Sequence, residues 1–294
     1  MKFAAIDIGS NAVRLLIVSA KKREGNLVIR KVSFTRVPLR LGDDVFETGL
    51  ISGGKAKNLV KVMRAFWYLM DVFGIDNFYA YATSAMRTAQ NREQVVEKVL
   101  REANVNIEVI EGDREADLIF KNFQSGDFAT KNDYLFVDLG GGSMELTLIR
   151  DGKRLRSKSF KIGTIRAMKS AIEDGEWKSV EEFVKYVSEG SRPLIAIGSG
   201  GNINRLHKIM GTPKKKPVII ERLEWIYHKL SNLSFNERVE KYGLKLDRAD
   251  VIVPAAEIYI KVMKLAGAEE ILVPRVGLSD GMLLELIENS KEFK

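Results

Sequence analysis

Two segments of the chain combine an aspartate with small residues in a pattern that could hold phosphate. Asp7 ends an apolar run and precedes Ile-Gly-Ser-Asn-Ala, and Asp138 ends another and precedes Leu-Gly-Gly-Gly-Ser. Each pattern predicts a strand, a tight turn and a second strand. Small residues let backbone N–H groups approach an anion, and an aspartate at a strand end can hold a cation. One copy alone would be an ordinary hairpin, but the matched pair predicts two facing halves that clamp a phosphate.

The order of predicted elements is also duplicated. Strands are expected at 2–8, 12–20, 26–36, 77–82, 106–110, 133–138, 143–150, 153–160, 193–197 and 270–273. Helices are expected at 54–73, 91–103, 112–125, 163–173 and 179–189, in most of 200–265, and from about 278. Three strands followed by alternating helices and strands, occurring twice, predict an α/β protein with mixed sheets.

The helix predicted from residue 112 places a carboxylate at the border of a buried stripe. The stripe follows the i, i+3, i+4, i+7 spacing of an amphipathic helix and consists of Ala116, Ile119, Phe120 and Phe123. At about 100° per residue, Glu115 lies on the border of this stripe and Arg114 lies on the opposite, solvent-facing side. A border carboxylate can be partly desolvated and still reach a cleft, although an ordinary surface glutamate has the same spacing.

Composition limits the chemistry. The chain has no cysteine and only two histidines, which disfavours thiol catalysis, imidazole metal clusters and a Ser-His-Asp triad. Its net charge of +8 favours anionic partners. No apolar stretch reaches the roughly 20 residues of a membrane span, and the start does not resemble a signal peptide, so we predict a cytoplasmic protein without a membrane partner. Nucleic acid is disfavoured because charge alone supports it.

Further motifs resemble one family. They are Ala82-Thr-Ser-Ala-Met-Arg-Thr-Ala-Gln-Asn91, Ile110-Glu-Gly-Asp-Arg-Glu-Ala116, Ala196-Ile-Gly-Ser-Gly-Gly-Asn-Ile-Asn204 and Arg248-Ala-Asp-Val-Ile-Val-Pro254. With the two hairpins, they resemble the exopolyphosphatase and guanosine pentaphosphate phosphatase (Ppx/GppA) family in its short two-domain form. The resemblance implies two actin-like (ribonuclease H-like) ATPase-fold domains with the active site in the cleft between them. Domain I is expected at 1–121 plus a C-terminal helix at about 279–294, and domain II at 122–278.

The resemblance also implies roles for individual residues. Glu115 matches the general base, and Asp138 and Glu145 match the carboxylates that hold a divalent cation. Mg²⁺ is expected because it prefers one or two carboxylates together with substrate phosphates. Asp7 and Arg87 are expected to orient the water or metal shell and to hold a phosphate. The expected substrate- and phosphate-binding residues are Ser10, Asn11, Ala12, Arg14, Thr83, Ser84, Gly140, Gly141, Gly142, Ser143, Gly200 and Gly201.

Arg14 and Glu145 occupy matching positions in the two copies. Arg14 therefore either forms a salt bridge across the cleft or belongs to an ion pair on its own strand face. The chain departs from the family pattern at Ala12, where a hydroxyl residue is common, at Arg114, where an acidic residue is usual, and at Asn202, where threonine is common. These departures bear on substrate preference more than on hydrolysis.

The predicted function is metal-dependent release of terminal phosphate from inorganic polyphosphate, guanosine pentaphosphate (pppGpp) or both. The resemblance further implies a homodimer. Two alternatives remain open at this point: an ATPase or kinase of the same fold, and a non-catalytic sensor of polyphosphate or an alarmone. The sequence does not rank polyphosphate against pppGpp.

Overall fold

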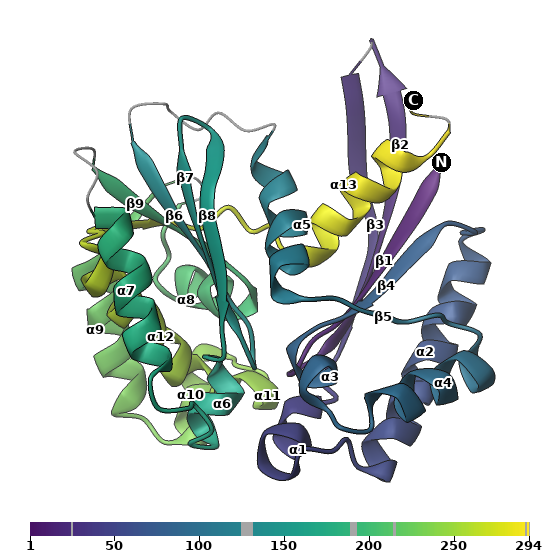
Figure 1. Ribbon diagram of the computed structural model, residues 1–294, viewed down its shortest axis with the longest axis horizontal. Helices are drawn as coiled ribbons and strands as arrows, with labels where there is room; N and C mark the ends of the chain where they lie inside the picture. The colour runs from purple at the N-terminus through teal and green to yellow at the C-terminus, as the bar shows by residue number, and fades with distance from the viewer. Residues whose placement is uncertain (25, 125–131, 189–192, 214–215, 292, 294) are drawn as a thin grey trace. The chain divides into compact units, whose positions relative to one another are not determined.

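The computed structural model describes residues 1–24, 26–124, 132–188, 193–213, 216–291 and 293 (Figure 1). It is an α/β structure with two mixed sheets, as predicted. The chain divides into two compact units, which we call unit 1 (Met1–Ser125 and Gly277–Lys294) and unit 2 (Gly126–Val276). Unit 2 is one continuous stretch, whereas unit 1 is assembled from two separate segments.

Unit 1 contains a five-stranded sheet in the order β3-β2-β1-β4-β5. Its strands are β1 (Lys2–Ile8), β2 (Val13–Arg23), β3 (Asn26–Val37), β4 (Phe78–Ala82) and β5 (Glu108–Val109). Strand β2 runs antiparallel to its neighbours β1 and β3, while β4 runs parallel to both β1 and β5. The carboxyl ends of three parallel strands, β1, β4 and β5, therefore lie at one edge, the usual place for ligands in α/β sheets.

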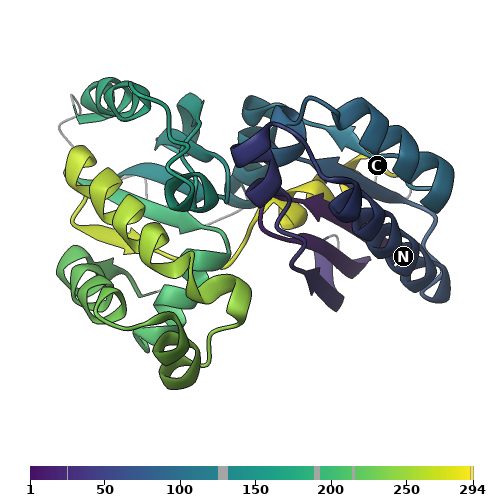
Figure 2. The ribbon, with the colours of Figure 1, turned by 90° about the horizontal axis from the view of Figure 1, so that it is seen from below.

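Helices cover both faces of this sheet (Figures 1 and 2). They are α1 (Leu41–Thr48), α2 (Gly53–Val72), α3 (Ser84–Thr88), α4 (Arg92–Ala103), α5 (Gly112–Gln124) and α13 (Leu278–Asn289). One face packs on α2 and α4, and its core includes Ile6 from the sheet with Met63 and Phe66 from α2. Helix α13 contacts β1, β2 and β4 and packs against α5.

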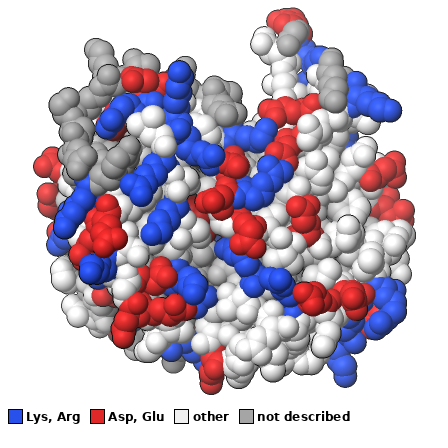
Figure 3. Space-filling model, in the orientation of Figure 1, with Lys and Arg blue, Asp and Glu red and all other residues white. Residues whose placement is uncertain are grey.

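Unit 2 contains a six-stranded sheet in the order β10-β11-β9-β6-β7-β8. Its strands are β6 (Asp133–Leu139), β7 (Met144–Arg150), β8 (Lys153–Phe160), β9 (Leu194–Ser199), β10 (Val218–Ile219) and β11 (Glu270–Leu272). Strands β6, β7 and β8 form the antiparallel meander, and β9 runs parallel to β6 and β11. Basic side chains lie exposed along the edge strand β8 (Figure 3), where charge discourages edge-to-edge pairing.

The helices of unit 2 surround a central buried helix. They are α6 (Thr164–Met168), α7 (Glu176–Ser188), α8 (Gly201–Ile209), α9 (Ile220–Ser231), α10 (Phe235–Tyr242), α11 (Leu246–Ala249) and α12 (Ile252–Ala266). Helix α12 contacts α6, α7, α8, α9 and α11, and most of its residues are buried. A helix that is apolar on nearly every side is typical of such a central position.

The structure corrects several predicted elements. Helix α1 was not predicted; it has eight residues and follows Arg40, which is in the left-handed conformation, without a side-chain cap. The short elements α3 and β10 were not predicted either. The helix predicted at 163–173 ends at Met168, because Ser170 adopts a left-handed conformation (φ 51°) that a helix cannot continue through. In the described part of the chain, no helix is both long and apolar enough to cross a membrane.

Candidate active-site residues

The hairpin of unit 2 sets two carboxylates opposite each other. Asp138 on β6 and Glu145 on β7 are direct cross-strand partners, and Ser159 from β8 donates a hydrogen bond of 2.9 Å to Glu145 Oε1. Glu145 is buried, at 1% exposure. Like charges at directly opposed positions destabilise a sheet, and oxygen ligands of this kind suit a hard divalent cation. The donor set therefore fits the predicted Mg²⁺.

The turn between these strands presents backbone N–H groups. The N–H of Gly140 is used within the turn, donating to the Ser143 carbonyl at 3.0 Å. The Gly141 carbonyl accepts from the backbone N–H of Ile165 at 2.8 Å. Within the described ranges, by contrast, no hydrogen bond occupies the N–H groups of Gly141, Gly142 or Ser143. Successive free N–H groups form an anion-binding concavity, which we call the glycine nest, residues 140–143.

Two residues that sequence reasoning missed hold the glycine nest in place. An added Cβ on Gly163 would lie 2.4 Å from both the Gly141 oxygen and the Gly142 nitrogen, so only glycine fits there. The buried Arg166 on α6 donates from Nε to the Gly142 carbonyl at 2.7 Å. An arginine in an apolar context was the available signal, but its partner lies 24 residues away.

The third glycine motif lies beside Asp138. Gly200 has φ +102°, and an added Cβ would lie 3.1 Å from the Leu139 carbonyl oxygen and 3.4 Å from Asp138 Oδ1. Next to it, Gly201 begins α8, and its carbonyl accepts a hydrogen bond from the Arg248 guanidinium. Gly200 is thus packed close to Asp138, and Gly201 contacts Arg248, the first residue of the Arg248–Pro254 motif.

A buried tyrosine is hydrogen-bonded to the backbone just before Gly200. The Tyr259 hydroxyl on α12 donates to the Ser199 carbonyl at 2.6 Å. Burial raises the pKa of Tyr259 well above its ordinary value, and the negative charge of Asp138 adds to the rise. Tyr259 therefore stays a neutral hydrogen-bond donor, a role that no local sequence pattern indicated.

The hairpin of unit 1 has the same register but a different charge. Asp7 on β1 and Arg14 on β2 are direct cross-strand partners, and Arg14 Nη1 lies 2.5 Å from Asp7 Oδ2. Of the two alternatives for Arg14, the strand-face ion pair is present. The strand position that Glu145 occupies in unit 2 is occupied in unit 1 by the positively charged Arg14.

The turn of this first hairpin is held by its carbonyl groups. The Ser10 and Asn11 carbonyls accept from the N–H groups of Gly42 and Arg40, each at 2.9 Å. Among the described residues, the N–H groups of Ser10 and Ala12 form no hydrogen bond. The same principle therefore operates in both turns, because the carbonyls are tied back and amides are left available for an anion.

The remaining predicted residues of unit 1 follow the ends of β4 and β5. The buried Thr83 and Ser84 come directly after β4, and the Thr83 N–H donates to the Ile8 carbonyl at 3.1 Å. Arg87 Nη1 lies 3.6 Å from Glu115 Oε2. Glu115 lies in the first turn of α5 and is 7% exposed. The structure thus gathers Thr83, Ser84, Arg87 and Glu115 at the carboxyl edge of the unit 1 sheet, the edge at which β1 and Asp7 end.

The prediction for Arg114 was wrong. Its guanidinium does not point freely into solvent but forms a two-point ion pair with the buried Glu285 on α13. The buried side of α5 is also wider than the predicted stripe, since Leu118 is fully buried while Phe120 is only half-buried. Both differences arise because α13 packs on α5, a contact far away in sequence.

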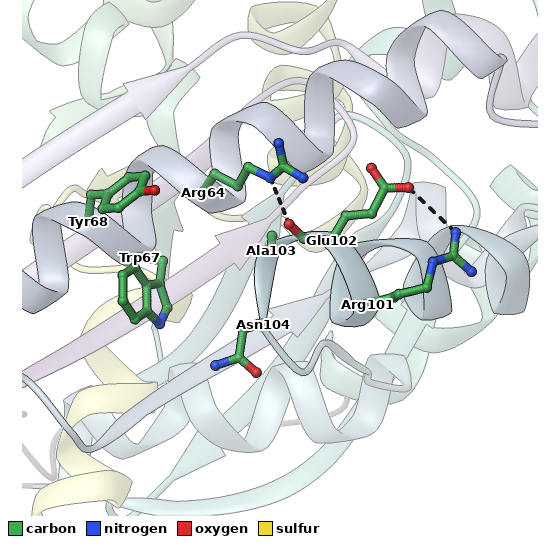
Figure 4. A pocket seen from close by; sticks show the side chains of 7 residues that line it. All are labelled: Arg64, Trp67, Tyr68, Arg101, Glu102, Ala103 and Asn104. Carbon is green, nitrogen blue, oxygen red and sulfur yellow. Dashed lines mark hydrogen bonds and ion pairs between the residues drawn. The ribbon is translucent and has the colours of Figure 1, made fainter.

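A pocket in unit 1 lies apart from these residues (Figure 4). It is formed by α2 and α4 and lined by Arg64, Trp67, Tyr68, Arg101, Glu102, Ala103 and Asn104. The Trp67 and Tyr68 rings meet edge-to-face with centroids 5.4 Å apart. Trp67, which the sequence did not distinguish, therefore has a specific setting, but none of the predicted site residues lines this pocket.

Comparison with known proteins decides the family. A family model described as the Ppx/GppA phosphatase family matches residues 17–290. The chain belongs to the Ppx/GppA phosphatase family. This membership confirms the predicted family, and the family's description as a phosphatase family agrees with the predicted class of hydrolase. The comparisons do not favour the alternative of an ATPase or kinase.

Named relatives of this Ppx/GppA chain differ in length and in activity. It is 28% identical to a bifunctional 3-dehydroquinate synthase/phosphatase from Fusobacterium nucleatum, over 97% of this chain and 46% of that protein. It is 25% identical to exopolyphosphatase 1 from Mycobacterium bovis, over 99% of this chain and 90% of that protein. It is 23% identical to a guanosine-5'-triphosphate,3'-diphosphate pyrophosphatase from Aeromonas hydrophila, over 99% and 60% respectively. The chain therefore spans about half the length of the first of these relatives.

Solved structures of the Ppx/GppA family confirm the predicted fold class. The Aquifex aeolicus family member matches with a TM-score of 0.75 and 26% identity, over 99% of both chains. An exopolyphosphatase from Cytophaga hutchinsonii matches with a TM-score of 0.85 and 22% identity, again over 99% of both chains. The second likeness concerns the fold alone.

Proposed function

We propose that this protein is a divalent-metal-dependent phosphohydrolase that releases terminal phosphate from inorganic polyphosphate, pppGpp or both. The observation that carries the proposal is the carboxylate pair Asp138 and Glu145, opposed across β6 and β7 and next to the open amides of the glycine nest. Such a site suits a cation and phosphate oxygens together. Relatives named as an exopolyphosphatase and as a guanosine pyrophosphatase support the two substrate classes.

The proposed reaction is the attack of water on the terminal phosphorus of the substrate. The carboxylate of Glu115 accepts a proton from a water molecule whose oxygen attacks the terminal phosphorus. The new bond joins that oxygen to phosphorus, the bond between phosphorus and the bridging oxygen breaks, and orthophosphate is released with a shortened chain. Mg²⁺, held by Asp138 and Glu145, would supply charge neutralisation at the phosphate oxygens.

The other residues position the phosphate rather than react with it. The amides of Ser10 and Ala12, like those of the glycine nest, are donors for phosphate oxygens of the substrate. Arg87 offers a planar guanidinium and, through its 3.6 Å contact, holds Glu115 in place. Asp7 is satisfied by Arg14, so in this proposal it orients the turn that carries Ser10. Localisation in the cytoplasm and assembly as a homodimer remain predictions of the sequence.

The test is phosphate release from tri-, tetra- and long-chain polyphosphate and from pppGpp in the presence of Mg²⁺. Glu115→Gln should lower turnover by at least about 100-fold, as expected for loss of a general base. Asp113→Asn is the matched control, because Asp113 is an exposed carboxylate in the same helical turn, and it should leave turnover within about twofold of wild type. Equal turnover by wild type and Glu115→Gln would overturn the assignment of the base. Tight Mg²⁺-dependent binding of polyphosphate with no turnover would establish the sensor alternative instead.

A further inference from the structure

Helix α5 carries the proposed base and is held along its length by helix α13. An added Cβ on Gly281 of α13 would lie 1.8 Å from the Leu118 carbonyl oxygen, so the two helices meet with no room for a side chain. Further along, the Asn122 amide donates to the Gly277 carbonyl at 3.2 Å. Helix α13 in turn contacts β1, β2 and β4, which ties the position of α5 to the sheet.

Arg114 is the contact of this helix pair that lies next to the base. Its Nη1 atom donates to Glu285 Oε2 at 3.0 Å, and its Nη2 atom donates to Oε1. A two-point guanidinium–carboxylate pair fixes both distance and orientation. Successive residues of a helix project about 100° apart, so anchoring Arg114 on α13 sets the rotation of the turn that aims Glu115 at Arg87, 3.6 Å away.

The surroundings make this pair costly to break. Glu285 is 8% exposed, and a buried carboxylate that loses its partner is strongly destabilising. The hydrogen bonds that Arg114 donates to Glu285 raise the pKa of Arg114, and a further hydrogen bond that it donates to the Tyr81 hydroxyl on β4 adds to the rise. Tyr81 is the strand neighbour of Asp7 in the sheet. The guanidinium therefore links α13, α5 and the strand next to β1.

We propose that the Arg114–Glu285 pair is a positioning device that holds the general base Glu115 in its productive orientation. The inference rests on the proposed function, because it assigns a purpose to the setting of Glu115. It also gives a role to Arg114, one of the three departures from the family pattern. Arg114 does not touch the substrate in this proposal and acts only through the helix turn.

A second ion pair joins the same two helices and provides the matched control. Lys121 Nζ lies 2.7 Å from Glu288 Oε2, in the last turn of α5 rather than the first. Because Lys121 Nζ also lies 3.9 Å from Glu285 Oε2, the control variant is Glu288→Gln, which leaves the contacts of Glu285 in place. If the two ion pairs only stabilised the packing of α5 on α13, loss of either pair would affect kcat equally. If the Arg114–Glu285 pair positions Glu115, its loss lowers kcat much more than loss of the more distant pair.

The experiment compares kcat, KM and melting temperature for five variants. Arg114→Ala and the isosteric Glu285→Gln should lower kcat by about 10- to 100-fold, because a displacement of about 1 Å costs this much, while KM stays within about twofold. Arg114→Lys should recover part of kcat, since lysine restores the charge but not the two-point geometry. Glu288→Gln should keep wild-type kcat even where its melting temperature falls. Glu115→Gln is the reference arm.

Each outcome separates the two proposals. If Glu115→Gln keeps wild-type turnover, the proposed base is wrong and the positioning role falls with it. If Glu115→Gln is inactive but folded Glu285→Gln keeps wild-type kcat, only the positioning role is wrong. Equal losses of kcat in Glu288→Gln and Arg114→Ala would also overturn it, because both ion pairs would then act only by holding α5 and α13 together. Should Arg114→Ala fail to fold, Glu285→Gln decides alone.

Discussion

Arg14 Nη1 lies 2.5 Å from Oδ2 of its cross-strand partner Asp7. The corresponding partners in unit 2 are Asp138 and Glu145, which share the same register but are both acidic. One hairpin is neutralised by its own side chain, and the other is left with two opposed carboxylates. Repulsion at such positions is relieved by a bound cation, so the two copies of one pattern have different electrostatic requirements.

Removing one of these two carboxylates should make the melting temperature of the protein nearly independent of Mg²⁺. We expect Mg²⁺ to raise the melting temperature of wild type, because a ligand that binds only the folded state stabilises it. Glu145→Gln should lose most of this rise, together with turnover, while keeping the shape of the side chain. Differential scanning fluorimetry with EDTA and with increasing Mg²⁺ checks this. An unchanged Mg²⁺-dependent rise in Glu145→Gln would place the metal elsewhere.

Gly163 should tolerate no side chain. In Gly163→Ala the new Cβ would overlap the backbone of Gly141 and Gly142 at 2.4 Å, which displaces the glycine nest. We expect a loss of stability of about 1–3 kcal/mol and a marked fall in turnover, measured by urea unfolding and phosphate release. Gly54→Ala is the control, because no atom lies within 4 Å of its added Cβ, and it should be neutral or stabilising. Wild-type turnover in Gly163→Ala would show that the nest is not needed.

Gly281 offers a test of the α5–α13 contact by volume rather than charge. Alanine favours a helix interior by about 1 kcal/mol over glycine, yet its Cβ would lie 1.8 Å from the Leu118 carbonyl oxygen. The overlap outweighs the gain, because backbone cannot move aside as a flexible side chain can. We expect Gly281→Ala to be net destabilised in chemical denaturation. A stabilised variant would mean that the helices separate without cost.

Stability should depend on pH through His207. Burial, followed by the positive charge of Arg275, lowers the pKa of His207 below its ordinary value of 6.5. The unfolded state then binds this proton more readily than the folded state, so the stability contribution is complete above pH 6.5 and declines as the pH falls below it. His207→Gln should show a flatter pH dependence than wild type in urea unfolding between pH 8 and pH 5.5. His228→Gln, at an exposed site on α9, should keep the wild-type slope.

Sequence patterns predicted those parts of the fold and of the site that are determined by residues close together in the chain. The two hairpins follow from apolar runs around small residues, and the α5 helix that carries Glu115 follows from its periodicity. Helix α1 was missed because eight residues after a left-handed Arg40 carry no capping signal. Short helices draw their stability from packing rather than propensity.

Contacts between distant segments could not be read from the sequence. The position of Arg114 on its helix was predicted from periodicity, yet its solvent-facing role was wrong because α13 covers that side of α5. In the same way, Arg166 gave no local indication that it would hold the carbonyl of Gly142. A helical wheel describes a single helix and contains no information about the helices that pack against it.

The two-segment construction of unit 1 has a consequence for how the protein is made. Glu285 is synthesised 171 residues after Arg114, so a growing chain on the ribosome exposes α5 long before α13 exists to pack against it. Unit 2, a continuous stretch, is able to fold during synthesis because domains fold as units in the order they emerge. Helices α5 and α13 can therefore pack together only after all of unit 2 has been synthesised, so the setting of Glu115 is completed late in synthesis.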